Sequence, residues 1–172
     1  MSHLQNLPSR RVILKSDRRR RFRSRSLHRP PLKSSHPCKE FSVPHAQGSF
    51  TVDVHPLTPT PAAGLSRFTI NKTIHGDLEA TTIGEMLAGG DPRQGAAGYV
   101  AIEVVTGTLD GKYGSFALQH FATMDANGPK MQVIAVPGSG TGDLKGIEGT
   151  FVIRIESGEH FYDFDYTLPS EQ

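Results

Sequence analysis

The chain has 172 residues, of which 36% are hydrophobic, and it contains 18 glycines, 12 prolines and no tryptophan. This mixture is typical of many short strands joined by turns. One cysteine, Cys38, excludes an intramolecular disulfide framework and a multi-cysteine zinc site. No apolar stretch approaches the roughly 18 residues that a membrane-spanning helix needs.

The net charge of +2 conceals two segments of opposite sign. Residues 1–45 hold 12 Lys/Arg and 2 Asp/Glu, a net charge of +10, whereas residues 46–172 hold 7 Lys/Arg and 15 Asp/Glu, a net charge of −8. We therefore divide the chain into a basic arm, 1–45, and an acidic domain, 46–172. An acidic domain is a poor partner for nucleic acid, because contacts between cationic side chains and phosphates supply most of the non-specific affinity.

The arm is rich in arginine and serine between Arg18 and Arg25 and then in proline. Its few apolar residues cannot offset the chain entropy, so we expect it to be disordered. It is not a secretory signal, because no apolar run follows the charges. Three interpretations stay open: an extension without a role, a targeting segment, or a tail that binds polyanions. Unless the arm is a targeting segment, we expect a cytoplasmic protein.

Segments with alternating apolar residues follow one another through the domain, separated by turn residues. The predicted strands are 48–55, 65–75, 78–87, 99–109, 112–124, 130–136, 149–156 and 160–168. Short turns are expected at 76–77, 110–111, 127–129 and 157–159, and longer loops at 58–64, 88–98 and 138–142. A single helical turn near Leu144 to Ile147 is the only helical structure expected.

About eight strands in meander order need closure to remove their edges. The sequence therefore predicts an all-β fold, a single antiparallel up-and-down β-barrel whose interior holds side chains or one small ligand.

Two hairpins decide which residues face the interior. A two-residue loop at Gly76-Asp77 places one group of residues on one face: Thr69, Asn71, Thr73, Ala80, Thr82 and Gly84. The opposite face then carries Phe68, Ile70, Lys72, Ile74, Glu79, Ile83 and Glu85.

The second hairpin turns at Asp110-Gly111. A three-residue loop, 110–112, places Val100, Ile102, Val104, Phe116, Leu118 and His120 on one face. Ala101, Glu103, Ala117 and Gln119 then lie on the other. A two-residue loop would exchange the faces of one strand, and the sequence leaves open which face lines the lumen.

Several motifs in a fixed order resemble a mostly bacterial family known only as domain of unknown function 3224. They are FTINKTIHGDL (68–78), GEML (84–87), GYVAIE (98–103), GTLDG (107–111), GSFALQH (114–120) and GSGTGDL (138–144). The match covers nearly all of residues 46–172. That family is similar in fold to the allene oxide cyclase barrel, which is calycin-like and of lipocalin size. The resemblance implies the fold and supplies no activity.

Three residues of the second hairpin are candidates for a site in the lumen. Burial would raise the pKa of Glu103 and make it an acid or base; alternatively, Glu103 faces water or is held by Lys72. Gln119 would be a hydrogen-bond anchor, and His120 a proton carrier or a half-exposed strand residue. Gln119 and His120 point to opposite faces, so only one of them enters the lumen.

The other candidates are charged or aromatic. Lys72 and Glu85 would orient a charged ligand or form a cross-strand ion pair. Tyr99, Tyr162 and Tyr166 offer a ring with a polar tip for a pocket, a rim or a core. The glycine-rich segment 138–142 lacks the residues of a phosphate loop, and we interpret it as a flexible loop at the barrel mouth.

No spacing of histidines and carboxylates indicates a metal, and we expect no cofactor. The leading hypothesis is a barrel that binds a small, largely apolar molecule in its lumen. The alternatives are a cyclase- or isomerase-type enzyme acting in that cavity, with Glu103 or His120 moving a proton, and a filled barrel that serves as a structural or self-association module. Inward-facing Ala101, Ala117 and Gly84 would favour a cavity, whereas the same residues facing outward would favour close packing between subunits.

Overall fold

The computed structural model describes residues 43–169, so all but the last three residues of the predicted arm, including Cys38, lie outside the described residues. The strands are β1 (His45–Leu57), β2 (Leu65–Gly76), β3 (Leu78–Asp91), β4 (Ala96–Leu109), β5 (Lys112–Asp125), β6 (Gly128–Ala135), β7 (Thr141–Gly142), β8 (Glu148–Glu156) and β9 (Glu159–Thr167). A 3-10 helix, Pro92–Gln94, lies between β3 and β4.

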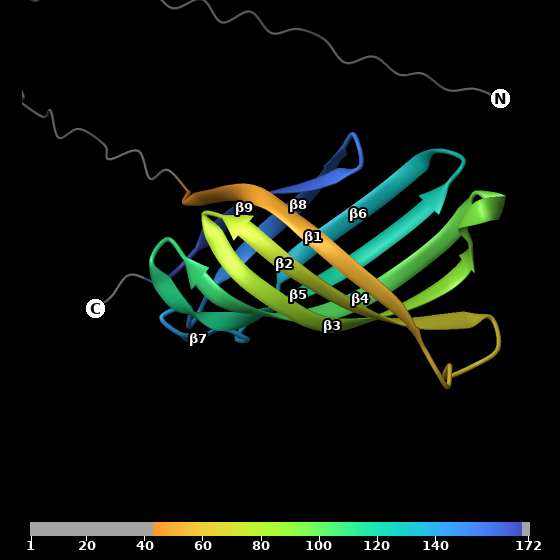
Figure 1. Cartoon of the computed structure of the whole chain (residues 1–172), viewed down its shortest axis with the longest axis horizontal. Helices are drawn as coiled ribbons and strands as arrows, with labels where there is room; N and C mark the ends of the chain where they lie inside the picture. Colours follow the sequence, from red (N-terminus) through yellow and green to blue (C-terminus); the bar gives the residue numbers. More distant parts are fainter. Residues whose placement is uncertain (1–42, 170–172) are drawn as a thin grey trace, which may run out of the picture. The chain divides into compact units, whose positions relative to one another are not determined.

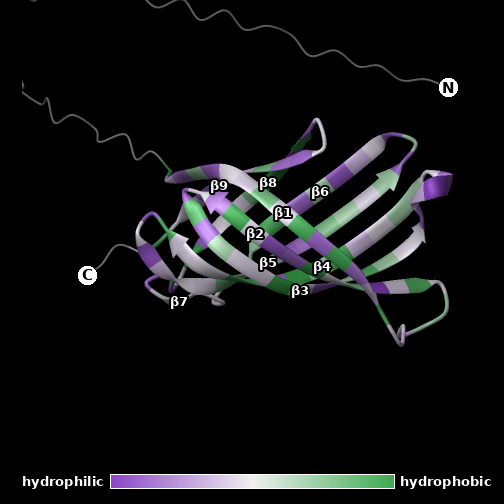
Figure 2. Cartoon of the chain, viewed as in Figure 1, coloured by the Kyte–Doolittle hydropathy of each residue, from purple (hydrophilic) through white to green (hydrophobic). Residues whose placement is uncertain are grey.

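Eight antiparallel strands close into a barrel in the order β4-β3-β2-β1-β9-β8-β6-β5, with β5 pairing back to β4 (Figure 1). The short strand β7 pairs only with β5. Hydrophobic and hydrophilic residues alternate along the strands (Figure 2), as a two-residue period requires when one face is buried. The predicted eight-stranded barrel is confirmed.

The turn between β4 and β5 is a two-residue loop, not the predicted three-residue one, because Leu109 pairs with Lys112. Asp110 and Gly111 have φ values of +48° and +78°, the left-handed combination whose twist suits a two-residue hairpin. The register therefore places Ala101 and Glu103 on the same face as Phe116, Leu118 and His120, and the predicted face assignment was wrong for β4.

The first hairpin also differs from the prediction by one residue. Ile74 pairs with Ala80, so the hairpin is centred on Asp77 instead of on Gly76-Asp77. The backbone of Asp77 is held by β1: its N–H donates to Gln47 O, and its carboxylate accepts from Gln47 N at 2.9 Å. As a result Lys72 and Thr82 share the inner face, which corrects the predicted separation of these two residues.

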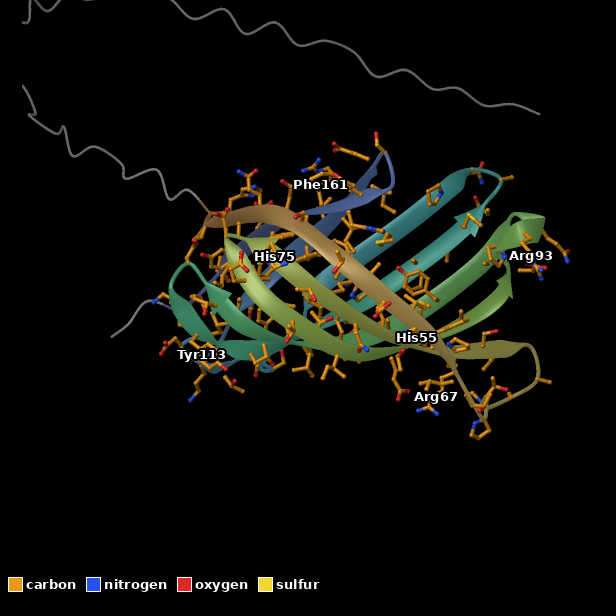
Figure 3. All side chains as sticks on the ribbon, in the orientation of Figure 1. His55, Arg67, His75, Arg93, Tyr113 and Phe161 are labelled. Carbon is orange, nitrogen blue, oxygen red and sulfur yellow. The ribbon has the colours of Figure 1, made fainter. Side chains whose placement is uncertain are left out.

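One end of the barrel is filled by its own side chains. Phe116, Phe151, Tyr162, Phe164 and Tyr166 are buried, and their rings pack at centroid distances of 5.0–5.7 Å. Leu144 and Ile147 from the β6–β8 connection are also buried in this core. Tyr113 and His75 lie near this end, and Arg93 near the opposite one (Figure 3).

The glycine-rich segment 138–142 belongs to the filled end and is not a free loop at an open mouth. Ser139 Oγ accepts from Ala117 N at 3.0 Å, and Asp143 N donates to Tyr113 O at 3.0 Å. Three hydrogen-bonded turns occupy the place of the predicted helical turn: Leu144 N donates to Thr141 O, Lys145 N to Gly142 O and Ile147 N to Leu144 O.

Candidate functional site

The other half of the lumen contains a cavity of about 450 Å³. One complete row of residues that are paired across five strands lines it: Ser66, Ala88, Tyr99, Ala122 and Met131. Phe68 and Met86 in the next row deeper, and the segments around Gly90, Pro92 and Pro129, complete the wall. The alternation of β-strands turns these small and apolar side chains inward, so the wall is predominantly apolar.

Tyr99 contributes a hydroxyl group to the wall of the cavity. The ring is partly exposed, and its Oη lies 4.0 Å from the sulfur of Met131, which is a weak acceptor. Burial raises the pKa of the Tyr99 phenol, and the negative charge of Glu103 raises it further. Tyr99 therefore presents a neutral O–H whose hydrogen bond is poorly used within the protein.

A buried polar network surrounds Glu103, which has no exposed surface. Oε1 accepts hydrogen bonds from Lys72 Nζ and, at 2.8 Å, from His120 Nε2. Oε2 accepts from the hydroxyl of Thr82 at 2.6 Å, and that hydroxyl in turn accepts from Lys72 N at 2.9 Å. The four residues come from β2, β3, β4 and β5, so the network joins half of the barrel wall.

The network holds Glu103 as a carboxylate. Burial alone would raise its pKa, but the hydrogen bond from His120, the charge of Lys72 and the bond from Thr82 outweigh burial and lower the pKa to about 2. Burial lowers the pKa of the Lys72 ammonium, and Glu103 offsets part of this effect. We describe the pair as ionised, because three donors converge on one carboxylate and the ammonium also lies 5.2 Å from the centroid of the Phe50 ring.

His120 has one ring nitrogen without a partner. Nε2 must carry a proton to donate to the Glu103 carboxylate, which leaves Nδ1 as an acceptor in the neutral ring. Nδ1 is buried and makes no hydrogen bond within the described part of the chain. An unused buried acceptor is uncommon in a folded protein and calls for an explanation.

Strand register places the network between the cavity and the filled end. His120 belongs to the row of Phe68, Met86 and Ala101, directly below the row of Tyr99. Glu103 lies one row deeper with Gly84, and Lys72 and Thr82 another row deeper with Phe116. The lumen is therefore apolar at its open end, polar in the middle and aromatic at its filled end.

The structure brings together four of the residues proposed from the sequence: Tyr99, Glu103, His120 and Lys72. The alternative in which Lys72 holds Glu103 is confirmed. The proposed Lys72–Glu85 pair is wrong, because Glu85 lies on the outer face and forms a bidentate pair with Arg67 at 2.8 Å.

The remaining candidates lie elsewhere. Gln119 is exposed on the outer face, since the two-residue turn puts His120 inside. Tyr162 and Tyr166 belong to the filled end. The hydroxyl of Tyr162 accepts from Leu78 N at 2.9 Å, and burial raises its pKa to about 12. Tyr166 donates to the Asp110 carboxylate.

Thr82 and the cavity residues Phe68 and Met86 were not identified from the sequence. Thr82 alternates with the small residues Ala80 and Gly84 along β3, and this pattern of small inward residues is the only available signal. Ala101 and Gly84 face inward, whereas Ala117 faces outward.

Within residues 43–169 no group of three or more His, Cys, Asp or Glu side chains is arranged to hold a metal. The same residues contain no helix that is long and apolar enough to cross a membrane.

A family described as "Protein of unknown function (DUF3224)" matches residues 46–166. The chain belongs to the DUF3224 family. Among solved structures, it is similar to a crystal structure of a DUF3224 protein of unknown function from Shewanella oneidensis MR-1. The identity is 41% and the TM-score 0.69, over 76% of this chain and 100% of the other. No curated protein matches the chain. The resemblance to this family that the sequence motifs carry is thereby confirmed.

Proposed function

We propose that this DUF3224 protein binds a small, largely apolar molecule in the open half of its barrel. The observation that carries the proposal is the cavity of about 450 Å³ beside Tyr99, lined mostly by apolar side chains. Pockets for small ligands have volumes of roughly 300–1,000 Å³ and combine an apolar wall with few polar groups.

The polar groups near the cavity indicate what kind of ligand would fit. Lys72 and Glu103 neutralise each other, so the network presents no net charge when His120 is neutral. Tyr99 offers a donor, and His120 Nδ1 an unused acceptor one row below it. A ligand with an apolar body and a single hydroxyl or carbonyl group is therefore preferred over an ion.

The proposal is tested with the uncharged fluorescent probe N-phenyl-1-naphthylamine and the full-length chain. Ala88 is half-buried and lines the cavity, so Ala88→Phe fills part of the space that the probe would occupy. Thr51→Phe adds a ring to an exposed position of β1 and is the matched control.

We expect the wild type and Thr51→Phe to bind the probe with equal affinity, and decan-1-ol to displace it. Ala88→Phe should weaken probe binding at least tenfold while its thermal unfolding stays cooperative. Equal binding by all three proteins, or failure of decan-1-ol to compete, would contradict a site in the lumen.

A second candidate function is proton transfer in the same cavity, as in a cyclase- or isomerase-type enzyme. The unpartnered Nδ1 of His120 favours it. Glu103 itself is a poor base, since a carboxylate with a pKa of about 2 holds a proton weakly. Of the two residues, His120 is the better proton carrier, and Glu103 would orient its ring.

Ring-nitrogen NMR of full-length protein tests the second candidate. We expect a proton on Nε2 of His120, which donates to Glu103, and we expect the Nδ1 resonance to shift when decan-1-ol is added. Absence of any shift under conditions in which decan-1-ol displaces the fluorescent probe would show that a bound hydroxyl does not reach His120.

A further inference from the structure

A band of large apolar side chains lies on the outside of the barrel. We call it the outer apolar face and define it by Ile83 of β3, Val100, Ile102 and Val104 of β4, and Phe121 of β5. Each of these side chains is at least 48% exposed, and Ile83 is 76% exposed. No element among the described residues covers them.

Strand pairing makes these side chains one continuous surface. Ile83 pairs with Val104, and Val100 pairs with Phe121. Ile102 lies between Val100 and Val104 on the same face of β4. Ala117 of β5 pairs with Val104, and its small side chain projects little from this part of the surface.

The area approaches that of a protein interface. The five side chains together expose on the order of 500 Å², which is in the range of the largest apolar patch on a typical monomer and is often functional. A standard interface buries about 800 Å² on each partner. Ile102 pairs with Glu85 of β3 and with Gln119 of β5, so these two polar residues flank the centre of the band and would add to the contact.

Charge restricts where a second copy of this chain can approach. Residues 46–172 carry a net charge of −8, so two such domains repel each other over most orientations. The outer apolar face holds no charge, and beside it Arg67 and Glu85 neutralise each other. This neutral band is where two acidic barrels can approach without a like-charge cost.

The shape of this surface also suits a contact between two copies. A groove of about 510 Å³ lies beside the band. Its lining combines apolar residues, among them Leu87, Val100 and Ile102, with the polar residues Arg67, Glu85 and Gln119. Phe121, which is 54% exposed, lies next to it across the β4–β5 pair. In a two-fold contact each copy meets the other with the same patch, so a protruding ring beside a groove can be complementary to itself.

We propose that the outer apolar face of β3, β4 and β5 joins two copies of the chain in a two-fold dimer. The β-branched side chains at its centre lose little rotational freedom when they become buried. This inference stands on the outer surface alone and is independent of the proposed ligand in the lumen.

The test is the concentration dependence of the oligomeric state of the full-length chain, measured by light scattering after gel filtration. We expect a dimer for the wild type. Ile102→Lys places an ammonium at the centre of the face in both copies and should raise the dimer dissociation constant by about 100-fold or more. Phe121→Ser removes the protruding ring without adding charge and should weaken the dimer as well.

Val152→Lys is the matched control, because Val152 is a β-branched residue, 47% exposed, on the outer face of β8. This variant should remain dimeric. A monomeric wild type, an odd-numbered oligomer, or a dimer that survives both Ile102→Lys and Phe121→Ser would overturn the proposal.

Discussion

His120 Nε2 lies 2.8 Å from Glu103 Oε1, and both side chains are buried in the middle of the barrel. The bond fixes the imidazole ring and leaves its other nitrogen without a partner. Lys72 and Thr82 donate to the same carboxylate. A charged group is thus retained inside a small barrel because three donors from three strands satisfy it.

Removal of one partner of the Lys72–Glu103 ion pair should reveal the free-energy cost of burying the other charge. Lys72→Met leaves the Glu103 carboxylate without its cation, and we expect the free energy of unfolding to fall by about 3–5 kcal/mol. The double variant Lys72→Met/Glu103→Leu should recover much of this loss, because it buries no charge. Urea denaturation of the two single variants and the double variant measures the coupling. Additive effects would show that the pair is not coupled.

The pH dependence of stability follows from the pKa of Glu103. Its folded value, about 2, is below the ordinary 4.5. The group therefore stabilises the fold above about pH 4.5, and this contribution disappears as the pH falls through about 2. The lost stability amounts to about 3 kcal/mol. Glu103→Gln should flatten this part of the curve of unfolding free energy against pH, and a curve parallel to the wild type would contradict the assignment.

Gly84 allows β3 and β4 to approach each other beside Glu103. An added Cβ would lie 2.4 Å from Ile102 O and 2.5 Å from Glu103 Cβ. Gly84→Ala should therefore lower the free energy of unfolding by about 2 kcal/mol or more. Gly89→Ala on the same strand is the control, since its Cβ would meet only Leu65 Cδ2, at 3.5 Å. Equal effects of the two substitutions would show that this close approach is unimportant.

The hydroxyl of Tyr162 should matter to the filled end. It accepts from Leu78 N at 2.9 Å, and both residues are buried. Tyr162→Phe leaves that N–H without a partner and should cost about 1–3 kcal/mol. Tyr113→Phe changes a residue that is 63% exposed and should be neutral. Thermal unfolding compares the two variants, and a neutral Tyr162→Phe would show that water replaces the hydroxyl.

The strands could be predicted from the sequence, because alternation and turn residues are local signals. The Asp110-Gly111 turn was located correctly, yet its loop length was predicted one residue too long. That single residue moved Glu103 to the face of Gln119 and away from His120. The predicted register of the first hairpin is also wrong by one residue. The contact that centres this hairpin on Asp77 comes from Gln47, which is distant in the sequence.

The buried network was beyond the reach of sequence patterns for a related reason. Lys72 and Glu103 are separated by 31 residues and lie on β2 and β4, with β3 between them. The two side chains meet only because the registers of both hairpins place them on the same inner face. The sequence offers Tyr99 as a ring with a polar tip for a pocket, a rim or a core, but the cavity beside it depends on which end of the barrel the aromatic residues fill.

The most direct test of ligand binding is a native mass spectrum of the full-length chain after incubation with an equimolar mixture of saturated fatty alcohols. We expect one bound alcohol on the wild type, released when the protein is denatured, and none on Ala88→Phe. A wild type that binds no alcohol, or an alcohol that remains bound to Ala88→Phe, would contradict a ligand site in the open half of the barrel.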